Sequence, residues 1–206
     1  MSGPALAVRL RALGAASVLD AAPGGAALGA SIRALWAPTA AAGPAFTIET
    51  EPDDNLALHR AVAEAPAGAV VVAATGGGTC AIFGDLLSQV ALARGLAALV
   101  TDGLVRDSDR IRAVGFPVFC TGLSLASPAK RAWGRVGVEV QVGDAAIAAG
   151  DWIVADGDGA VVVPAAAAGA TADAAEAVRA REAELVARAA AGEATVDQLG
   201  LRPGAS

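Results

Sequence analysis

The middle of the chain alternates between short apolar runs and longer stretches in which apolar residues recur every three or four positions. Runs such as AVVVAA (69–74) are rich in Val and contain no charged residue, which favours buried strands. The longer stretches have the helical period, and Gly95 and Gly115 end two of them. The order predicted is strand 69–74, helix 84–94, strand 96–100, helix 106–114 and strand 116–120. This rhythm is typical of a parallel βαβ core.

The segments on either side of this core have different patterns. Before it, residues 4–19 and 55–65 have helical spacing, and AFTIET (45–50) alternates like a short strand. After it, three apolar stretches are separated by Gly-Asp turns without helices, which predicts a mostly antiparallel second β layer at 136–142, 145–156 and 159–164. A charged helix follows at about 171–191, with Gly192 as its stop. We therefore predict an α/β fold in a single domain, 1–206, with a C-terminal helix.

Composition and charge exclude several classes of protein. A net charge of -6 argues against binding to nucleic acid or to an anionic membrane surface. No apolar segment has the length and composition of a transmembrane helix. Cys80 and Cys120 lie 40 residues apart in apolar surroundings and do not form a disulfide framework. We expect both thiols to be reduced and the protein to be cytoplasmic.

The residues that are missing narrow the possible chemistry. The chain has one His, His59, and no Tyr, and it lacks a Cys/His cluster with zinc spacing. His59 falls on a predicted amphipathic helix, where a packing or capping role is the simpler interpretation. The only Lys is Lys130, in a polar stretch, where we expect a surface or rim residue. Carboxylates, arginines and backbone amides remain as the candidate functional groups.

The glycine loop TGGG (75–78) after strand 69–74 has three interpretations. Gly76, Gly78 and Ala81, with Asp102 about twenty residues later, approximate a dinucleotide fingerprint. The loop could instead be a plain tight turn. In the third interpretation, free N–H groups between Gly84 and Leu87 hold a small carboxylate.

Two polar segments follow consecutive predicted strands, and together they are the densest cluster of candidate functional residues. One is Gly84-Asp85-Leu86-Leu87, and the other runs from Thr101 to Arg106-Asp107. Ligands bind at the carboxyl ends of strands in open α/β sheets. Arg106 has the planar fork that suits a carboxylate, and Asp85 and Asp107 can supply oxygen ligands to a Mg²⁺-like ion.

The run GDLLSQVALARGLAALVTDGLVRDSDRIRAVGFPVFCTG resembles the family of 4-hydroxy-4-methyl-2-oxoglutarate aldolases. That family also contains the regulator of ribonuclease E activity A and related oxaloacetate decarboxylases. DNLALH (54–59), SPAK (127–130) and DGDGAVVVP (156–164) extend the resemblance, which covers the chain from about Ser17 to Glu193. It implies an α/β/β/α sandwich assembled as a homotrimer or a dimer of trimers, with active sites between subunits.

The same resemblance implies a Mg²⁺- or Mn²⁺-dependent lyase that cleaves 4-hydroxy-2-oxoacids, and oxaloacetate, to pyruvate. In this interpretation Asp107 is the direct metal ligand, Asp85 holds a metal-bound water, and Arg106 stabilises the developing enolate. A glutamate of a neighbouring subunit's C-terminal helix completes the water shell, with Glu182 as the first choice and Glu184 as the alternate. The catalytic residues implied are Arg106 and Asp85, and the substrate-binding residues are Arg106, Gly84, Asp85, Leu86 and Leu87.

Elementary chemistry agrees with this implication. Retro-aldol cleavage and decarboxylation of oxaloacetate both pass through a pyruvate enolate, which a divalent metal and an arginine can stabilise. A Schiff-base route would need Lys130, so the metal route is favoured. The alternative functions are a non-catalytic protein-binding regulator of a ribonuclease on the same scaffold and a dinucleotide-binding oxidoreductase. The presence of Asp85, Arg106, Asp107 and a tail glutamate together favours the enzyme.

Overall fold

A computed structural model of the chain describes residues 2–202. The helices are α1 (Gly3–Leu13), α2 (Ala15–Ala21), α3 (Leu56–Glu64), α4 (Asp85–Ala93), α5 (Ser108–Val114), α6 (Ala168–Ala190) and α7 (Thr195–Gln198). The longer strands are β3 (Ala41–Glu49), β4 (Val70–Ala74), β6 (Ala98–Thr101), β8 (Val118–Cys120), β13 (Trp152–Asp156) and β14 (Gly159–Val163). The short strands are β1 (Ala26–Ala27), β2 (Arg33–Ala34), β5 (Ala81–Phe83), β7 (Leu104–Val105), β9 (Gly122–Leu123), β10 (Arg135–Val136), β11 (Val140–Val142) and β12 (Ala145–Ile147).

Strand β3 joins the parallel and the antiparallel parts of the main sheet. Its second half, from Ala45 to Glu49, pairs in parallel with β4, and β6 and β8 continue in parallel beyond β4. Its first half, from Ala41 to Pro44, pairs antiparallel with β13, which forms a hairpin with β14. The predicted βαβ core and the predicted antiparallel strands are therefore both present, and one long strand connects them.

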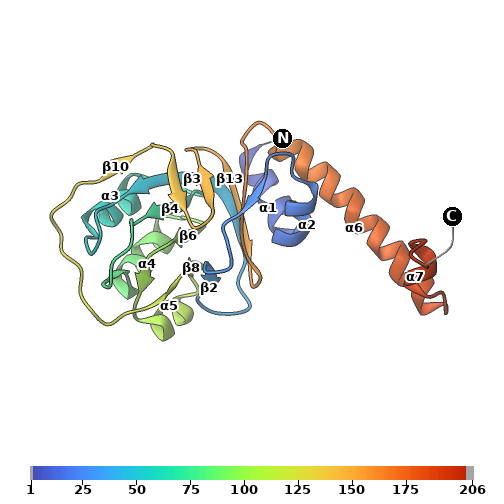
Figure 1. Cartoon of the computed structure of the whole chain (residues 1–206). Helices are drawn as coiled ribbons and strands as arrows, with labels where there is room; N and C mark the ends of the chain where they lie inside the picture. The colour runs from blue at the N-terminus through green and yellow to red at the C-terminus, as the bar shows by residue number, and fades with distance from the viewer. Residues whose placement is uncertain (1, 203–206) are drawn as a thin grey trace.

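Side chains that alternate along the strands divide the interior into three apolar layers. On β4, Val71 and Ala73 face α3, α4 and α5, whereas Val70 and Val72 face the inner side of β13 and β14. On β13, Trp152 and Val154 point outward to α1, α2 and the start of α6. Figure 1 shows these two groups of helices on opposite sides of the strands. The layering confirms the expected α/β/β/α sandwich.

A second, smaller parallel sheet was not predicted. It consists of β5, β7 and β9, each only two or three residues long. Runs this short have no detectable periodicity, so only their pairing identifies them. The segments that follow β5 and β7 contain Asp85 and Arg106, so this small sheet, and not the ends of β4 and β6, positions the predicted site.

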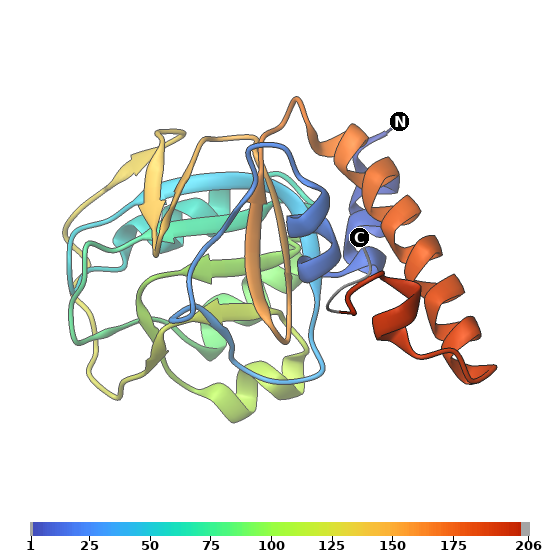
Figure 2. The same cartoon turned by 45° about the vertical axis from the view of Figure 1, so that its right-hand side comes forward.

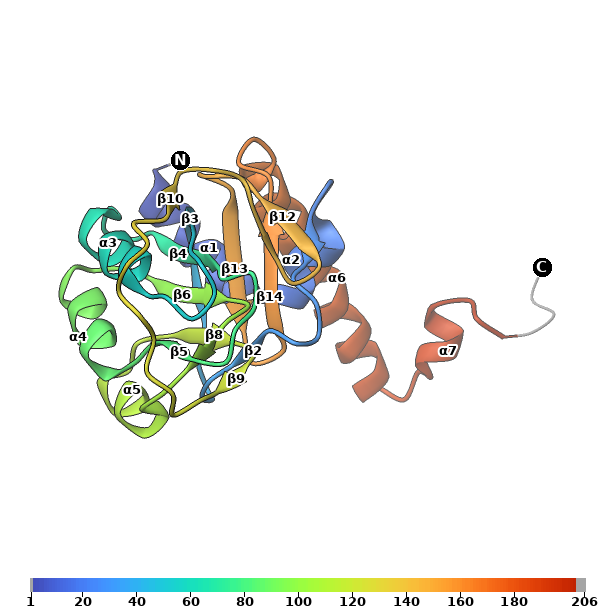
Figure 3. The same ribbon diagram turned by 60° about the vertical axis from the view of Figure 1, so that its left-hand side comes forward.

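The terminal helices pack against each other on the outer face of the antiparallel strands. The predicted helix 4–19 is broken at Gly14, whose φ of 83° starts a new helix in another direction. Arg9 of α1 bonds Asp173 and Glu176 of α6, which ties the two helices together. Figures 2 and 3 show α1 and α2 beside the first part of α6, while the rest of α6 runs away from the sandwich.

Cys80 and Cys120 are both free thiols. Within residues 2–202, no helix combines the length and apolarity needed to cross a bilayer.

Candidate active site

The predicted site residues meet in a small cavity beside α3, α4 and α5. Asp85 begins α4 directly after β5, and Arg106 and Asp107 connect β7 to α5. The cavity has a volume of about 120 Å³, and a wider hollow of about 520 Å³ shares Arg106 and Asp107 with it. The small cavity is lined by Asn55, His59, Gly84, Asp85, Leu86, Leu87, Arg106, Asp107 and Lys130.

Asp107 has an unusual backbone conformation that directs its carboxylate toward α4. Its φ is 60°, in the left-handed region that residues other than glycine seldom adopt, and it precedes the first turn of α5. Its Oδ2 accepts a hydrogen bond from the Asp85 N–H at 3.2 Å and lies 3.6 Å from Arg106 Nε. Such conformations concentrate at functional sites, because the surrounding structure must stabilise them.

Gly84 leaves the space that this carboxylate occupies. A Cβ added at Gly84 would lie 2.7 Å from Asp107 Oδ2 and 3.2 Å from Arg106 Cγ. The Gly84 backbone is extended, so the absence of a side chain, and not a special φ, is what the site requires there. Gly84 is predicted from the resemblance to bind substrate, and its missing side chain also makes room for Asp107.

Arg106 has one hydrogen-bonded guanidinium nitrogen, and its other donors are available to a ligand. Its Nη1 donates a hydrogen bond to Ser127 Oγ at 2.9 Å, and its side chain is 39% exposed. A guanidinium carries five N–H donors, so several remain for a carboxylate or an enolate oxygen. Ser127 was not singled out from the sequence as a site residue, although it lies in the SPAK segment.

Asp85 and the first turn of α4 also line the small cavity. Asp85 Oδ1 accepts a hydrogen bond from Gln89 Nε2 at 2.9 Å, and its Oδ2 lies 3.6 Å from Arg110 Nη1. The first turn of a helix leaves its N–H groups without helical partners. Asp85 uses its own N–H on Asp107, which leaves the N–H groups of Leu86 and Leu87 available to an anion.

The donors present suit a hard divalent cation that shares its ligands with substrate and water. Mg²⁺ typically takes one or two carboxylates and keeps several waters, and Asp107 and Asp85 are two carboxylates on one cavity. Residues 2–202 contain no cluster of three or more His, Cys, Asp or Glu side chains that could enclose a metal alone. The chain therefore offers an open site and not a closed metal cage.

Within one chain, Glu182 and Glu184 lie apart from Asp85, Arg106 and Asp107. Both belong to α6, whose buried residues, Ala168, Thr171, Ala172 and Ala175, all lie in its first eight positions. The remaining turns extend away from α4 and α5, on the far side of the sandwich (Figure 3). Neither glutamate lines the cavities that contain Arg106 and Asp107.

His59 and Lys130 are cavity residues, which the sequence did not reveal. The chain's only His and only Lys both line the cavity with Asp85, Arg106 and Asp107. Burial lowers the pKa of His59 below its ordinary value, and the charge of Lys130 lowers it further. Each is the only residue of its type, which could have drawn attention to it. The sequence did not indicate that they share a cavity, because 71 positions separate them along the chain.

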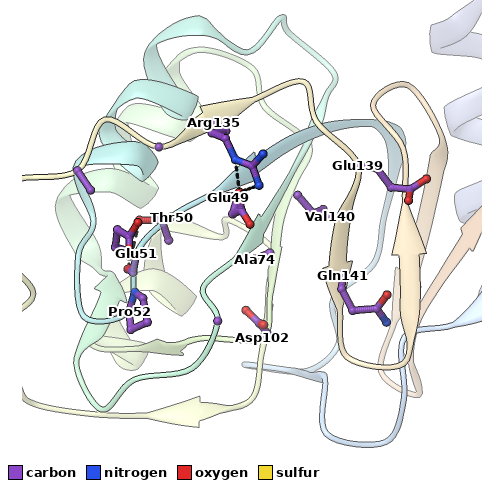
Figure 4. A pocket seen from close by; sticks show the side chains of 13 residues that line it. Glu49, Thr50, Glu51, Pro52, Ala74, Asp102, Arg135, Glu139, Val140 and Gln141 are labelled. Carbon is purple, nitrogen blue, oxygen red and sulfur yellow. Dashed lines mark hydrogen bonds and ion pairs between the residues drawn. The ribbon is translucent and has the colours of Figure 1, made fainter.

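A larger hollow lies elsewhere, at the carboxyl ends of β3, β4 and β6. It has a volume of about 770 Å³, and Figure 4 shows the Arg135 guanidinium against the Glu49 carboxylate on its wall. Asp102 also lines it, and its Oδ1 accepts hydrogen bonds from the backbone N–H and hydroxyl of Thr75. Asp102 thus holds the glycine loop in place, and that loop leads into strand β5 instead of a helix, unlike a dinucleotide-binding turn. The predicted residues Asp85, Arg106 and Asp107 line the smaller cavity and not this hollow.

Comparisons with known proteins show what the chain is similar to. The family model described as RraA-like, Aldolase/RraA, matches residues 15–162. A Halalkalibacterium halodurans protein, provisionally named as a 4-hydroxy-4-methyl-2-oxoglutarate aldolase, is 36% identical over 157 residues, or 76% of this chain and 75% of that protein. A solved structure of an uncharacterized Pseudomonas syringae protein has a TM-score of 0.85 at 27% identity, covering 98% of this chain and 95% of that one. Streptomyces coelicolor RraAS2, described as an unusual member of the RNase ES inhibitor RraA family, has a TM-score of 0.75 at 28% identity, covering 91% and 97%.

Proposed function

Since this chain belongs to the RraA-like family, Aldolase/RraA, we propose that it is a divalent-metal-dependent lyase that releases pyruvate from 4-hydroxy-2-oxoacids. The substrates proposed are 4-hydroxy-4-methyl-2-oxoglutarate-type oxoacids and oxaloacetate. The observation that carries this proposal is the left-handed Asp107, whose carboxylate lies between the Asp85 N–H and the Arg106 guanidinium. A protein-binding surface does not require that strained arrangement.

The chain's own groups are placed to bind a pyruvyl unit. The Leu86 and Leu87 N–H groups at the start of α4 bind its carboxylate, helped by the helix dipole. The free donors of Arg106 bind the 2-oxo oxygen and stabilise the negative charge that develops there when the carbon–carbon bond breaks. Ser127 fixes the guanidinium, so no reorganisation is needed as that charge develops.

Asp107 would hold the Mg²⁺ or Mn²⁺ directly, and Asp85 would hold one of its waters. The ion would supply Lewis-acid polarisation of the 2-oxo group. Gln89 holds Asp85 Oδ1, which leaves Oδ2 to accept a hydrogen bond from that water. Lys130 is not required as a Schiff-base nucleophile in this scheme.

The direct test is pyruvate release from oxaloacetate and from 4-hydroxy-4-methyl-2-oxoglutarate, with Mg²⁺ or Mn²⁺ and then with excess EDTA. We expect release from at least one substrate with metal and none with EDTA. Release that EDTA leaves unchanged would refute the metal mechanism. A folded protein that releases no pyruvate from either substrate would refute the enzyme proposal.

We further propose that the active form is a homotrimer or a dimer of trimers, in which Glu182 of a neighbouring copy completes the site. This is supported by the second half of α6, which has no buried residue, and by exposed leucines beside the site. Leu86 is 69% exposed, Leu123 59% and Leu125 93%, and covering this apolar surface with another copy would be favourable.

Mixed oligomers can test this arrangement. Asp107→Ala and Glu182→Ala chains should each be inactive alone and regain partial activity when they are assembled together. A hybrid contains sites that combine an intact Asp107 from one chain with an intact Glu182 from the next. Hybrids without activity, or a fully active monomer, would refute the shared site.

The second candidate is the non-catalytic ribonuclease regulator, which the name of the Streptomyces coelicolor neighbour suggests. It predicts that the chain binds a ribonuclease whether or not metal is present. It also predicts that Arg106→Ala leaves this binding intact. Neither behaviour is expected of the lyase.

A further inference from the structure

The active-site cavity has a second polar edge that the lyase mechanism does not use. Asn55, His59 and Lys130 line the cavity together with Asp85, Arg106 and Asp107, and the mechanism above gives the first three no role. Asn55 and His59 belong to the start of α3, whereas Lys130 lies on the long connection after β9. We call Asn55, His59 and Lys130 the distal edge.

Backbone hydrogen bonds fix the connection of Lys130 against the start of α3. The Asn55 N–H donates to the Ala129 carbonyl at 3.0 Å, and the Ala129 N–H donates to the Asp53 carbonyl at 2.7 Å. Buried Asp54 then accepts the Arg131 N–H at 2.7 Å through Oδ2. The backbone at Lys130 is therefore held in place, whereas the Lys130 side chain is exposed to solvent.

The distal edge has unsatisfied hydrogen-bonding capacity. Lys130 has no ion-pair partner anywhere in the described part of the chain. Asn55 is 7% exposed, and its amide N–H₂ donates to the Ile82 carbonyl, but its Oδ1 is buried without a hydrogen-bond partner among residues 2–202. A buried acceptor without a protein partner is uncommon in a folded protein and keeps its capacity to accept a hydrogen bond from a ligand.

The charges of the cavity suit a ligand with two carboxylates. Asp85 and Asp107 cancel Arg106 and Lys130, so the cavity alone is formally neutral. A bound divalent cation would raise the net charge of the cavity to +2, which balances the charge of a dianion.

We propose that Lys130 and His59 bind the second carboxylate of a 2-oxo-dicarboxylic acid and so select the distal half of the substrate. Lys130 supplies the charge, and neutral His59 supplies an N–H donor. Asn55 Oδ1 accepts from a hydroxyl group or water next to that carboxylate. This inference rests on the proposed lyase function, because it assumes that Leu86, Leu87 and Arg106 bind the pyruvyl unit.

Binding of two matched ligands that the enzyme cannot cleave tests the proposal. 2-Oxoglutarate lacks the hydroxyl needed for retro-aldol cleavage, and 2-oxopentanoate has the same chain length with a methyl group in place of the second carboxylate. Calorimetry with saturating Mg²⁺ should give the wild type a preference for 2-oxoglutarate of about 10-fold or more. Lys130→Met should bring the two affinities to within about twofold of each other.

Two further variants control the interpretation. Arg131→Met removes the same charge one residue away, from an exposed side chain outside the cavity, and should keep the preference. His59→Phe keeps a flat ring but removes the N–H, and should lower the preference by about fivefold. Thermal melts of all three variants check that they fold.

The outcomes separate this inference from the proposed function. A wild type without preference, a Lys130→Met variant that keeps it, or an Arg131→Met variant that loses it equally would overturn the distal edge. Failure of the wild type to bind either oxoacid would instead refute the lyase site itself.

Discussion

Gly84→Ala should weaken metal binding with little effect on stability. The added Cβ would lie 2.7 Å from Asp107 Oδ2, so that oxygen must move to the 3.4 Å of ordinary contact, a shift of about 0.7 Å. Ligand distances in metal sites are held within about 0.2 Å, so the shift exceeds the tolerance severalfold. We expect the Mn²⁺ dissociation constant to rise by about 10-fold or more, and pyruvate release to fall with it.

Stability should change little for two reasons. The atoms that the Cβ meets belong to Arg106 and Asp107, which are each 39% exposed and can rotate toward solvent. The Gly84 backbone has a φ of −162°, which alanine adopts freely, so the loss of unfolded-state entropy favours the variant by about 0.4–1 kcal/mol. The net change in unfolding free energy should stay within about 1 kcal/mol.

Calorimetric Mn²⁺ titration and urea unfolding measure the two effects separately. Gly157→Ala is the matched control, because no heavy atom lies within 4 Å of its added Cβ, and it should leave Mn²⁺ affinity unchanged. A folded Gly84→Ala variant with wild-type Mn²⁺ affinity would show that Asp107 is not a ligand. A large loss of stability would show that the Gly84 contact is part of the packing and not of the site.

Three other predictions concern catalysis, burial and pH. Arg106→Ala and Asp107→Ala should each lower kcat/KM for oxaloacetate by about 10³-fold or more, with melting temperatures near wild type; retained activity in either would contradict the assigned roles. Asp54→Ala should lower the unfolding free energy by about 3 kcal/mol in urea, because the buried Asp54 carboxylate accepts three backbone N–H groups, and a loss below 1 kcal/mol would contradict that account. Burial and then Lys130 lower the folded-state pKa of His59, so the unfolded chain binds the proton more tightly. Stability should therefore fall as pH drops below about 6.5, and His59→Gln should remove that part of the decline; an identical pH profile would exclude it.

Much of the fold and the first half of the site could be predicted from the sequence, because both depend on local patterns. The periods of two and 3.6 residues identify strands and helices within single segments, and the glycine stops delimit them. Arg106 and Asp107 are adjacent, and Asp85 lies one βα unit earlier, so the topology of a parallel core was enough to group them. The resemblance in that same run of residues supplied the chemistry.

Other features of the site depend on tertiary pairing, which local sequence patterns do not contain. Strands β5, β7 and β9 are too short to leave a period, yet they position Asp85 and Arg106. His59 and Lys130 meet only because backbone hydrogen bonds hold the connection around Ala129 against the start of α3. Pairing between distant segments depends on hydrogen bonds that close long loops, and no window of the sequence contains both partners. The sequence by itself therefore determined the layers of this protein and the grouping of Asp85, Arg106 and Asp107, whereas tertiary pairing alone brought the distal edge to the same cavity.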